Sequence, residues 1–249
     1  MSRKTNKNGK SFLKRKVKNR FLRICIRTIL FLFVSSSLYA VACRWVFPPI
    51  TITQAVDLCS GYGLKRDYVS WDNISPNVKL AAMASEDQLF ADHEGIDWKA
   101  IDRSMDDKKH KKRAKGAAAS TITQQTAKNV FLWQGSGWGR YIRKVPEFYF
   151  TYIIEWTWGK KRILEVYLNV IEMGPGVYGI EAASRKYFNK SAKNLSRAEA
   201  AMIIACLPNP KRFSVKPMSR YISRRYPAIM TQMNNIEGMP DIHELVYGN

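Results

Sequence analysis

Hydrophobic positions are most concentrated near the N-terminus, where residues 28–43 read T-I-L-F-L-F-V-S-S-S-L-Y-A-V-A-C. With their flanks, residues 24–46 supply about 20 mostly apolar positions, which is the length that a helix needs to cross a bilayer. Residues 1–27 contain eleven Lys or Arg and no acid, and such a flank stays in the cytoplasm under the positive-inside rule. The pattern predicts a basic cytoplasmic tail at 1–23, a single-pass transmembrane anchor at 24–46 and an extracytoplasmic remainder.

Two processed N-termini compete with this anchor. A signal peptide could be cleaved beside Ala40 and Ala42, and Cys43 could carry a lipid. However, more than twenty largely polar and basic residues precede the apolar run, which is long for the n-region of a signal peptide. Ala40 also stands where a lipoprotein signal usually has a larger aliphatic residue. We therefore expect the helix to be retained.

Beyond the anchor, the hydrophobic pattern changes to short segments with helical spacing. Residues 47–70 mix proline and glycine with a β-branched run at 50–53, which predicts a juxtamembrane connector with one strand. Residues 71–236 are predicted to form one mainly α domain, followed by a C-terminal tail at 237–249. Helices are predicted at 76–86, 96–105, 160–169, 180–188 and 219–236, and a capping box at Ser196 and Glu199 precedes another at 200–206.

One further predicted helix follows a glycine-rich loop at 135–139 and opens with R-K-V-P-E at 143–147. It is apolar nearly all round, which predicts that it lies in the core. Glu147 is then a carboxylate at the lip of a buried helix, with Arg143 and Lys144 one turn before it. The large side chains of this helix are Phe148, Tyr149, Tyr152, Ile153, Ile154 and Trp156.

The first candidate chemistry lies at 81–95, which reads A-A-M-A-S-E-D-Q-L-F-A-D-H-E-G. The Ser-Pro pair at 75–76 suits a helix start, and small or apolar residues at helical spacing extend the helix to Glu86. A helix C-terminus disfavours anions by about 0.3 to 1 kcal/mol each. Glu86 and Asp87 therefore stand where acidic residues are unfavourable, and such exceptions are expected at functional sites. The plain alternative is a solvated acidic loop in which His93 only forms local hydrogen bonds.

A second polar stretch, at 117–129, reads A-A-A-S-T-I-T-Q-Q-T-A-K-N. Ser120 and Thr121 suit a helix start, while Gln125 and Lys128 place amide and cationic donors on adjacent turns. A helix N-terminus with hydroxyls and a lysine suits phosphate. Composition alone favours the alternative, a polar surface helix.

Charge and cysteine content narrow the choice of partners. The formal net charge is +21, and residues 45–249 carry 29 Lys or Arg against 20 acids, a surplus of +9. Nucleic acid, anionic lipid or pyrophosphate could each bind such a surface, but an extracytoplasmic domain meets membrane anions first. The charged run at 106–115 is either a solvated segment or a flap over an anionic substrate. The cysteines lack metal-ligand spacing, and only Cys59 and Cys206 could form a disulfide.

Five motifs, taken in order, resemble a known family. They are E-D-Q-L-F-A-D-H-E-G at 86–95, S-T-I-T-Q-Q-T-A-K-N at 120–129, R-K-V-P-E at 143–147, K-R-I-L-E-V-Y-L-N at 161–169 and G-I-E-A-A-S-R-K-Y-F at 179–188. They resemble the motifs of the bacterial peptidoglycan glycosyltransferases of glycosyltransferase family 51, over about residues 70–215. The resemblance implies a lysozyme-like, mainly α fold with two lobes and a groove. It also implies a domain partly embedded in the surface of the bacterial inner membrane, on its outer side.

The same resemblance implies polymerisation of lipid II into glycan strands, by an inverting β-1,4 glycosyl transfer that releases undecaprenyl pyrophosphate. By motif position, Glu86 would be the general base that takes the proton of the acceptor's GlcNAc 4-hydroxyl, whose oxygen attacks MurNAc C1 of the donor. Lys128, Arg143 and Lys144 would stabilise the departing pyrophosphate, and Glu147 would be a second essential carboxylate. The other implied substrate-binding residues are Asp87, Phe90, His93, Ser120, Thr121, Gln125 and Asn129.

Cofactors and partners are implied in the same way. Glu147 would either orient the cations or hold a divalent metal such as Mg²⁺ or Mn²⁺ against the pyrophosphate, and no organic cofactor is implied. The expected partners are lipid II, the growing glycan strand, membrane lipid and other proteins of cell-wall synthesis or division, with no nucleic acid. Inhibition by the phosphoglycolipid moenomycin is implied as well.

Three positions depart from the family pattern. Ala118 stands where glycine is usual, Pro146 where a helix-compatible residue is usual and Gln88 where a basic residue is common. None of them removes a catalytic carboxylate. A lysozyme-like glycan hydrolase is the enzymatic alternative, because paired carboxylates in such a fold can also cleave, but it does not explain the set of cations. A basic, membrane-anchored scaffold or nucleic-acid binder is the non-enzymatic alternative.

Overall fold

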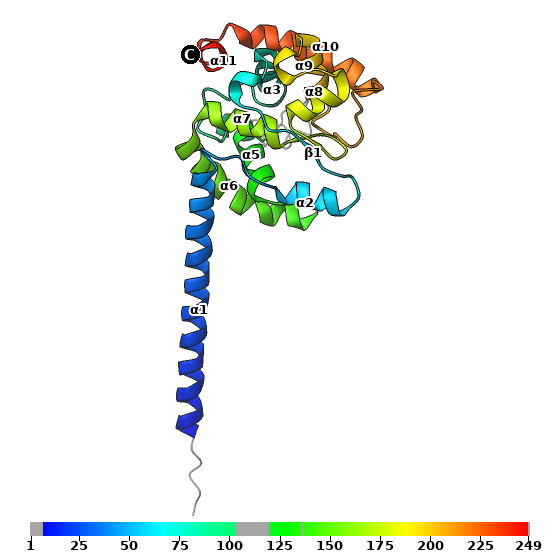
Figure 1. Cartoon of the computed structure of the whole chain (residues 1–249). Coiled ribbons are helices and arrows are strands. Elements are labelled where there is room, and N and C mark those ends of the chain that lie inside the picture. The colour runs from blue at the N-terminus through cyan, green and yellow to red at the C-terminus, as the bar shows by residue number, and fades with distance from the viewer. Residues whose placement is uncertain (1–6, 103–119, 136, 249) are drawn as a thin grey trace, which may run out of the picture.

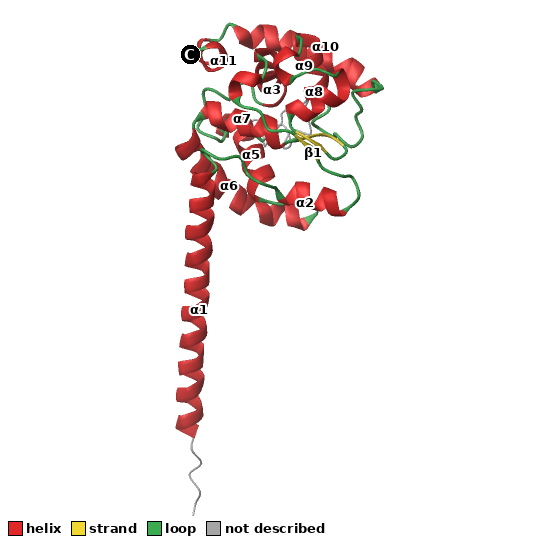
Figure 2. Cartoon of the chain, viewed as in Figure 1, coloured by secondary structure: helices red, strands yellow, loops and turns green. Residues whose placement is uncertain are grey.

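A long N-terminal helix projects from a helical domain in this computed structural model, which describes residues 7–102, 120–135 and 137–248, with side chains from residue 20 onward (Figure 1). Figure 2 shows that the domain is built almost entirely of helices, as expected, around a small sheet. The proposed flap at 106–115 and Ala118 lie outside the described residues. The helices are α1 (Lys7–Ala42), α2 (Ile52–Cys59), α3 (Pro76–Glu86), α5 (Ile122–Phe131), α6 (Trp138–Trp158), α7 (Lys160–Val170), α8 (Ile180–Phe188), α9 (Arg197–Ile204), α10 (Arg220–Glu237) and α11 (Pro240–Tyr247), with short 3₁₀ turns at Trp71–Asn73 and Ala192–Asn194.

Helix α1 has the length and composition of a membrane-spanning helix. Within it, Arg20–Ala42 is a 23-residue segment with a mean hydropathy of 1.9, and 6% of it is buried. The expected anchor at 24–46 therefore corresponds to this helix, although the helix ends at Ala42 and starts well before residue 24. Since the helix is almost entirely exposed, it has the character of a single-pass anchor and not of a core helix.

The last turns of α1 pack on α6 and join the anchor to the domain. The hydroxyls of Ser36 and Ser37 lie 3.2 and 2.6 Å from the Tyr149 hydroxyl. Nearby, the Trp158 indole N–H donates to the Ala40 carbonyl over 2.8 Å. These hydrogen bonds hold α6 beside the end of the anchor.

The connector at 47–70 contains one strand, as expected, but its β-branched run at 50–53 begins helix α2. Thr51 caps α2, because its hydroxyl accepts the Gln54 N–H while the Gln54 side chain accepts the Thr51 N–H. This capping box outweighs the β preference of the run. The strand of the segment is instead β1, Lys65–Arg66.

A three-stranded sheet of order β1-β3-β2 links this connector to the rest of the domain. Strand β3 (Val177–Tyr178) runs parallel to β1 and antiparallel to β2 (Glu172–Gly174). Asp57 of α2 accepts a 2.6 Å hydrogen bond from the Tyr178 hydroxyl and pairs with Lys211 at 2.6 Å. Two side-chain contacts therefore hold α2 against β3 and the loop that precedes α10.

Two groups of helices share one hydrophobic core. Helix α5 packs against α6 and α7, while α3 packs against α9 and α10, and Figure 1 shows the first group nearer to the free length of α1. This arrangement agrees with the lysozyme-like, mainly α fold that the motifs implied. The four cysteines are free, with Cys59 exposed and Cys206 buried in the core, so the disulfide that the sequence left open is not formed.

Helix α6 is amphipathic, and the expectation that it is buried all round is wrong. Phe150, Ile154 and Trp158 lie in the core, whereas Trp156 is 89% exposed. A helix beside a membrane anchor can present apolar side chains outward, so apolar composition does not by itself indicate burial. The exposed face also carries Trp138, Tyr141, Ile142, Val145 and Tyr152.

The segment 237–249, expected as a tail, forms helix α11. Pro240 occupies its first turn, where a missing N–H costs nothing. Ile242 and Val246, at i and i+4, belong to the main hydrophobic core, which is why this short segment is helical. The expected tail is therefore a helix that packs on the core.

Candidate active site

Glu86 is the last residue of α3, as the sequence predicted. The Ser75 hydroxyl caps the helix by accepting the Asn77 N–H. Glu86 is half-buried. One carboxylate oxygen accepts the Ser85 hydroxyl at 3.0 Å and the other accepts the Gln125 side-chain N–H at 3.2 Å. The carboxylate is therefore held in one orientation while part of it remains accessible.

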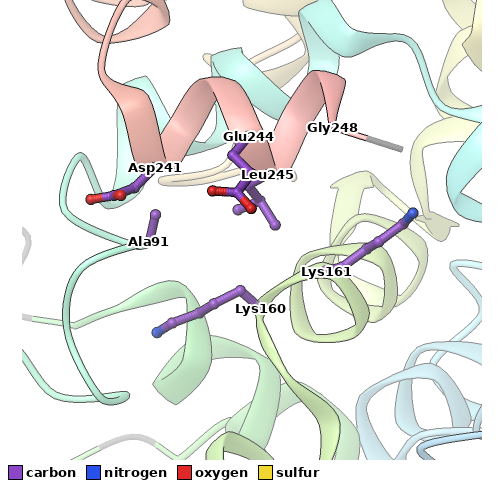
Figure 3. Close-up of a pocket in the computed structure, with 7 residues that line it drawn as sticks. All are labelled: Ala91, Lys160, Lys161, Asp241, Glu244, Leu245 and Gly248. Atoms are coloured by element: carbon purple, nitrogen blue, oxygen red, sulfur yellow. The ribbon is translucent and has the colours of Figure 1, made fainter.

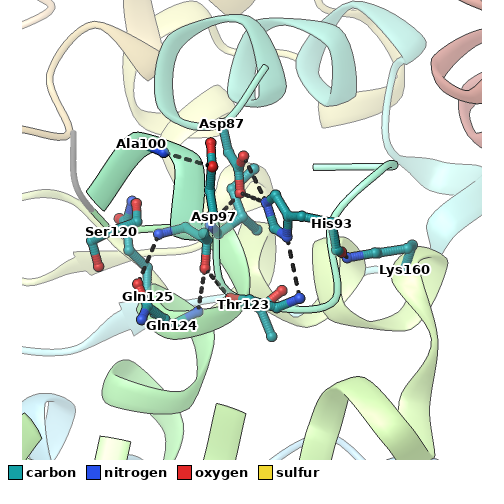
Figure 4. Close-up of polar contacts among 12 residues, drawn as sticks. Asp87, His93, Asp97, Ala100, Ser120, Thr123, Gln124, Gln125 and Lys160 are labelled. Atoms are coloured by element: carbon teal, nitrogen blue, oxygen red, sulfur yellow. Dashed lines mark hydrogen bonds and ion pairs between the residues drawn. The ribbon is translucent and has the colours of Figure 1, made fainter. Parts of the chain in front are cut away.

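Asp87 joins the end of α3 to the start of α5 (Figure 4). Both of its oxygens lie 3.0 Å from His93 Nε2, and one of them accepts the Ile122 backbone N–H at 2.9 Å. His93 Nδ1 accepts the Gly95 N–H, so Nε2 is the nitrogen that donates to Asp87. These contacts involve both Asp87 oxygens and both ring nitrogens, and binding of the substrate by Asp87 and His93 stays a prediction. They position the neighbouring Glu86.

Phe90 also belongs to this framework, since its side chain has no exposed surface and cannot contact a substrate. The Lys160 ammonium lies 4.8 Å from its ring centroid and donates to the His93 carbonyl. The same ammonium pairs with Glu155 at 2.5 Å. Lys160, which the sequence did not indicate as a site residue, thus holds the loop that contains Phe90 and His93 against the start of α7 (Figure 4).

Helix α5 begins as predicted, with Thr121 as its cap. The Thr121 hydroxyl accepts the Gln124 N–H and donates to the Gly95 carbonyl at 2.6 Å. Thr121 is 5% exposed, so its role is to cap the helix and fix the loop. Ser120 is half-buried beside Gln125, whose side chain reaches the Ser120 carbonyl at 3.4 Å. Of the two hydroxyls, Ser120 is the one a ligand can approach.

A cluster of three cations and one carboxylate lies at the junction of α5 and α6. Glu147 is 2% exposed; one of its oxygens is 2.5 Å from the Lys144 ammonium and the other is 3.4 Å from Arg143 Nε. Arg143 also donates to the Trp133 carbonyl. Burial lowers the pKa of Lys128; the charges of Arg143 and Lys144 act in the same direction, and Glu147 opposes them. We call Lys128, Arg143, Lys144 and Glu147 the cation cluster.

Glu86 and the cation cluster are linked electrostatically through Lys128. The negative charge of Glu86 acts on Lys128 and raises its pKa against the effect of burial, so the two groups are within electrostatic reach. Asn129, one residue further along α5, is 6% exposed and accepts a hydrogen bond from Gln134. The site thus contains a fixed carboxylate whose charge acts on one member of a group of positive charges.

Tyr167 is a site residue that the sequence analysis missed. Its hydroxyl donates to the side-chain oxygen Oε1 of Gln125 at 3.3 Å, and the side-chain Nε2 of Gln125 in turn donates to Glu86. Burial raises the pKa of Tyr167 well above its usual value, and the charges of Glu86 and Asp87 add to this. The sequence indicated Tyr167 only through its place in the motif at 161–169. Its contact with Gln125 depends on the packing of α7 on α5.

Tyr167→Phe should lower kcat about fivefold and leave KM unchanged, because losing a hydrogen bond of about 1 kcal/mol frees Gln125 to turn away from Glu86. Steady-state kinetics would measure this. Tyr187→Phe is the matched control, since it removes a buried hydroxyl that donates to the Met173 carbonyl. Equal effects of both variants on kcat would contradict the positioning role.

Two of the three departures from the family pattern can be placed in the structure. Pro146 lies inside α6, which starts at Trp138 and not at Arg143 as expected. Lys144 and Arg143 nevertheless both reach Glu147, so the proline does not separate them. Gln88 is exposed, with its side chain turned to the Ala84 carbonyl. Because position 88 is glutamine, no cationic side chain stands beside Glu86 at this position.

Comparison with known proteins gives consistent matches. A family model described as transglycosylase matches residues 53–234. A biosynthetic peptidoglycan transglycosylase of Bdellovibrio bacteriovorus is 46% identical over 214 residues, 84% of either chain. Proteins of the same name are 42% identical in Bacteroides thetaiotaomicron, over 90% of this chain and 91% of that protein, and 49% identical in Haemophilus influenzae, over 70% of either chain.

Proposed function

This chain belongs to the transglycosylase family, and on that premise we propose that it polymerises lipid II, with Glu86 as the general base. The family and its relatives make the chain a peptidoglycan glycosyltransferase, an enzyme that builds glycan strands. The observation that carries the proposed mechanism is the placement of Glu86, held by Ser85 and Gln125 within electrostatic reach of Lys128.

Glu86 removes the proton of the acceptor's GlcNAc 4-hydroxyl. Its two oxygens are held by hydrogen bonds from neutral groups, and no cation pairs with it among the described residues. A carboxylate that is held in a fixed orientation and is not bound by a cation suits proton abstraction. The hydroxyl oxygen then attacks MurNAc C1 from the face opposite the leaving group, which gives inversion and a β-1,4 link.

The cation cluster stabilises the leaving undecaprenyl pyrophosphate. Preorganised positive groups are most effective where water is excluded, and Lys128 and Arg143 are largely buried. The pyrophosphate is already a stable anion, so no general acid is obligatory. Ser120 precedes α5, Gln125 lies in its first turn and Asn129 in its last, and these residues would hold donor phosphate and sugar.

Glu147 orients the cation cluster in this proposal. A divalent cation there would find one carboxylate that already pairs with Lys144 and Arg143. Among the described residues, no group of three or more His, Cys, Asp or Glu side chains is placed to hold a metal. Because Glu147 already pairs with two cations, we propose that it orients them and does not hold Mg²⁺ or Mn²⁺.

The proposed topology places the N-terminus in the cytoplasm and the domain on the outer side of the bacterial cytoplasmic membrane. The basic flank of α1 supports this orientation. The exposed apolar face of α6 and the exposed Ile52 and Val56 of α2 support contact of the domain with membrane lipid, where a lipid-linked substrate lies.

The alkaline limb of kcat/KM should lie below the pKa of an ordinary lysine, because burial lowers the pKa of Lys128 and its ammonium is lost as pH rises. Lys128→Arg should move this limb to higher pH, since a guanidinium stays charged. A pH–rate series on both proteins, with substrate well below KM, would measure the shift. If the alkaline limb had the same position in Lys128→Arg, the charge of Lys128 would not be one that the reaction needs.

Incubation of the purified protein with labelled lipid II tests the proposed function. Growth of glycan polymer, suppressed by moenomycin, is expected. Shortening of preformed glycan without polymer growth would favour a lysozyme-like hydrolase, since paired carboxylates can also cleave.

A further inference from the structure

A second group of lysines lines a cavity away from the cation cluster. The cavity has a volume of about 590 Å³ and lies among the start of α3, the first turn of α7, the Ala192–Asn194 turn and the end of α11. Lys79, Lys161 and Lys193 line it together with Trp71 and Tyr247. We call this the lysine pocket.

Lys79 is the residue that makes the lysine pocket unusual. It is 3% exposed, and its ammonium lies 3.8 Å from the Trp71 ring centroid. Within the described residues, no oxygen lies within hydrogen-bonding distance of this ammonium, although the charges of Asp72 and Glu165 act on it from further away. Burial lowers the pKa of Lys79 to about 8. The Trp71 ring is a cation–π partner of this ammonium, but an aromatic face accepts no conventional hydrogen bond, and a buried charge is normally also paired with an anion.

Two exposed lysines complete the positive charge. Lys161 lies 5.6 Å from the Trp71 ring centroid, and neither Lys161 nor Lys193 forms an ion pair with a described residue. Figure 3 draws the adjoining pocket between α7 and α11, which Lys161 also lines together with Asp241 and Glu244, and shows that Lys160 and Lys161 leave α7 in opposite directions. Lys160 forms an ion pair with Glu155. Of the two lysines, Lys161 is the one that lines the lysine pocket.

The charge balance of the lysine pocket is positive. Asp72 is the one acidic residue among its lining residues, against three lysines, which leaves a formal surplus of +2. Lys161 also stands in the first turn of α7, where the helix dipole disfavours a cation. Three lysines therefore line one pocket, one of them buried and one at an unfavourable helix start, and this excess of positive charge favours the binding of an anion.

We propose that the lysine pocket binds a compact phosphate-type dianion, such as pyrophosphate or a phosphate monoester. Lysine ammonium groups bind phosphate as point charges. Lys161 and Lys193 are exposed and can turn toward the ligand, whereas Lys79 is buried. Trp71 and Tyr247 provide walls for an attached organic group. Helix α11 lies at the end of the domain away from the free length of α1 (Figure 1), which favours a soluble anion over a lipid headgroup.

Site-resolved amine labelling tests this proposal independently of polymerisation. The full-length protein in detergent is acetylated with acetic anhydride, with and without pyrophosphate, and the modification of each lysine is measured by mass spectrometry. Labelling of Lys79, Lys161 and Lys193 should fall about tenfold when pyrophosphate is at ten times its Kd, because about one site in eleven is then free. Lys216, exposed on another loop, is the internal control.

The Lys161→Met variant supplies the second arm, since an exposed lysine can be replaced without disturbing the core. It should abolish most of the protection of Lys193, whereas Lys216→Met, with the same loss of charge, should leave it intact. Protection by phosphatidylglycerol vesicles but not by pyrophosphate would assign the same chemistry to a lipid headgroup. Absence of protection with both ligands, or equal protection of Lys216, would overturn the proposal.

Discussion

Glu86→Gln should lower the rate of glycan polymerisation by about 10²- to 10⁴-fold, the usual contribution of a general base. The amide keeps the shape of the side chain and can still bond Ser85 and Gln125, but it cannot accept the proton of the acceptor hydroxyl. Binding of lipid II should be unchanged, because the cation cluster that holds the pyrophosphate is intact.

Polymer formation from labelled lipid II and equilibrium binding of lipid II would be measured side by side on this variant. Glu94→Gln is the matched control, since Glu94 is an exposed acid of the same motif and its loss should change neither quantity. Turnover near the parent rate in Glu86→Gln would refute the role of Glu86, and equal losses in both variants would point to a general effect on the loop.

Glu147→Gln should combine a severe loss of polymerisation with a loss of stability of about 3 kcal/mol or more, because removing one member of a buried ion pair leaves the other charges uncompensated. Glu147 is 2% exposed and Arg143 is 6% exposed, so water cannot replace the lost carboxylate. Lys128, Arg143 and Lys144 would then repel one another at the place where the pyrophosphate binds.

Urea unfolding and lipid II polymerisation would measure the two effects of Glu147→Gln. Glu237→Gln is the control, because the pair of Glu237 with Arg197 is at the surface and such pairs contribute about 1 kcal/mol or less. A Mg²⁺ titration of both proteins separates the two roles of Glu147: orientation of the cations predicts the same metal dependence in parent and variant, whereas a metal ligand would weaken it in the variant alone.

Local signals predicted the elements that carry the chemistry. Ser75 and Pro76 start α3, Thr121 starts α5, and Ser196 and Glu199 form the expected capping box. Each rests on hydrogen bonds within four residues of sequence, which is why the sequence reveals them. Placement of Glu86 at a helix end followed from the same local rules.

Contacts between distant segments could not be predicted in this way. Asp87 accepts the Ile122 N–H from 35 positions away, and Tyr167 reaches Gln125 from 42. Residues that the motifs suggested as ligands of the substrate, such as Phe90, are buried by this packing. Likewise, the outward face of α6 depends on the adjacent anchor, and α11 depends on the core it covers.

Chemical rescue is the most direct test of the claim that Glu86 acts as a base. Glu86→Ala leaves space for a small carboxylate, and the rate of lipid II polymerisation would be measured with increasing formate. The account predicts a nearly inactive variant whose rate rises with formate concentration, while Glu147→Ala does not respond. Polymerisation by Glu86→Ala near the parent rate in the absence of formate would contradict it.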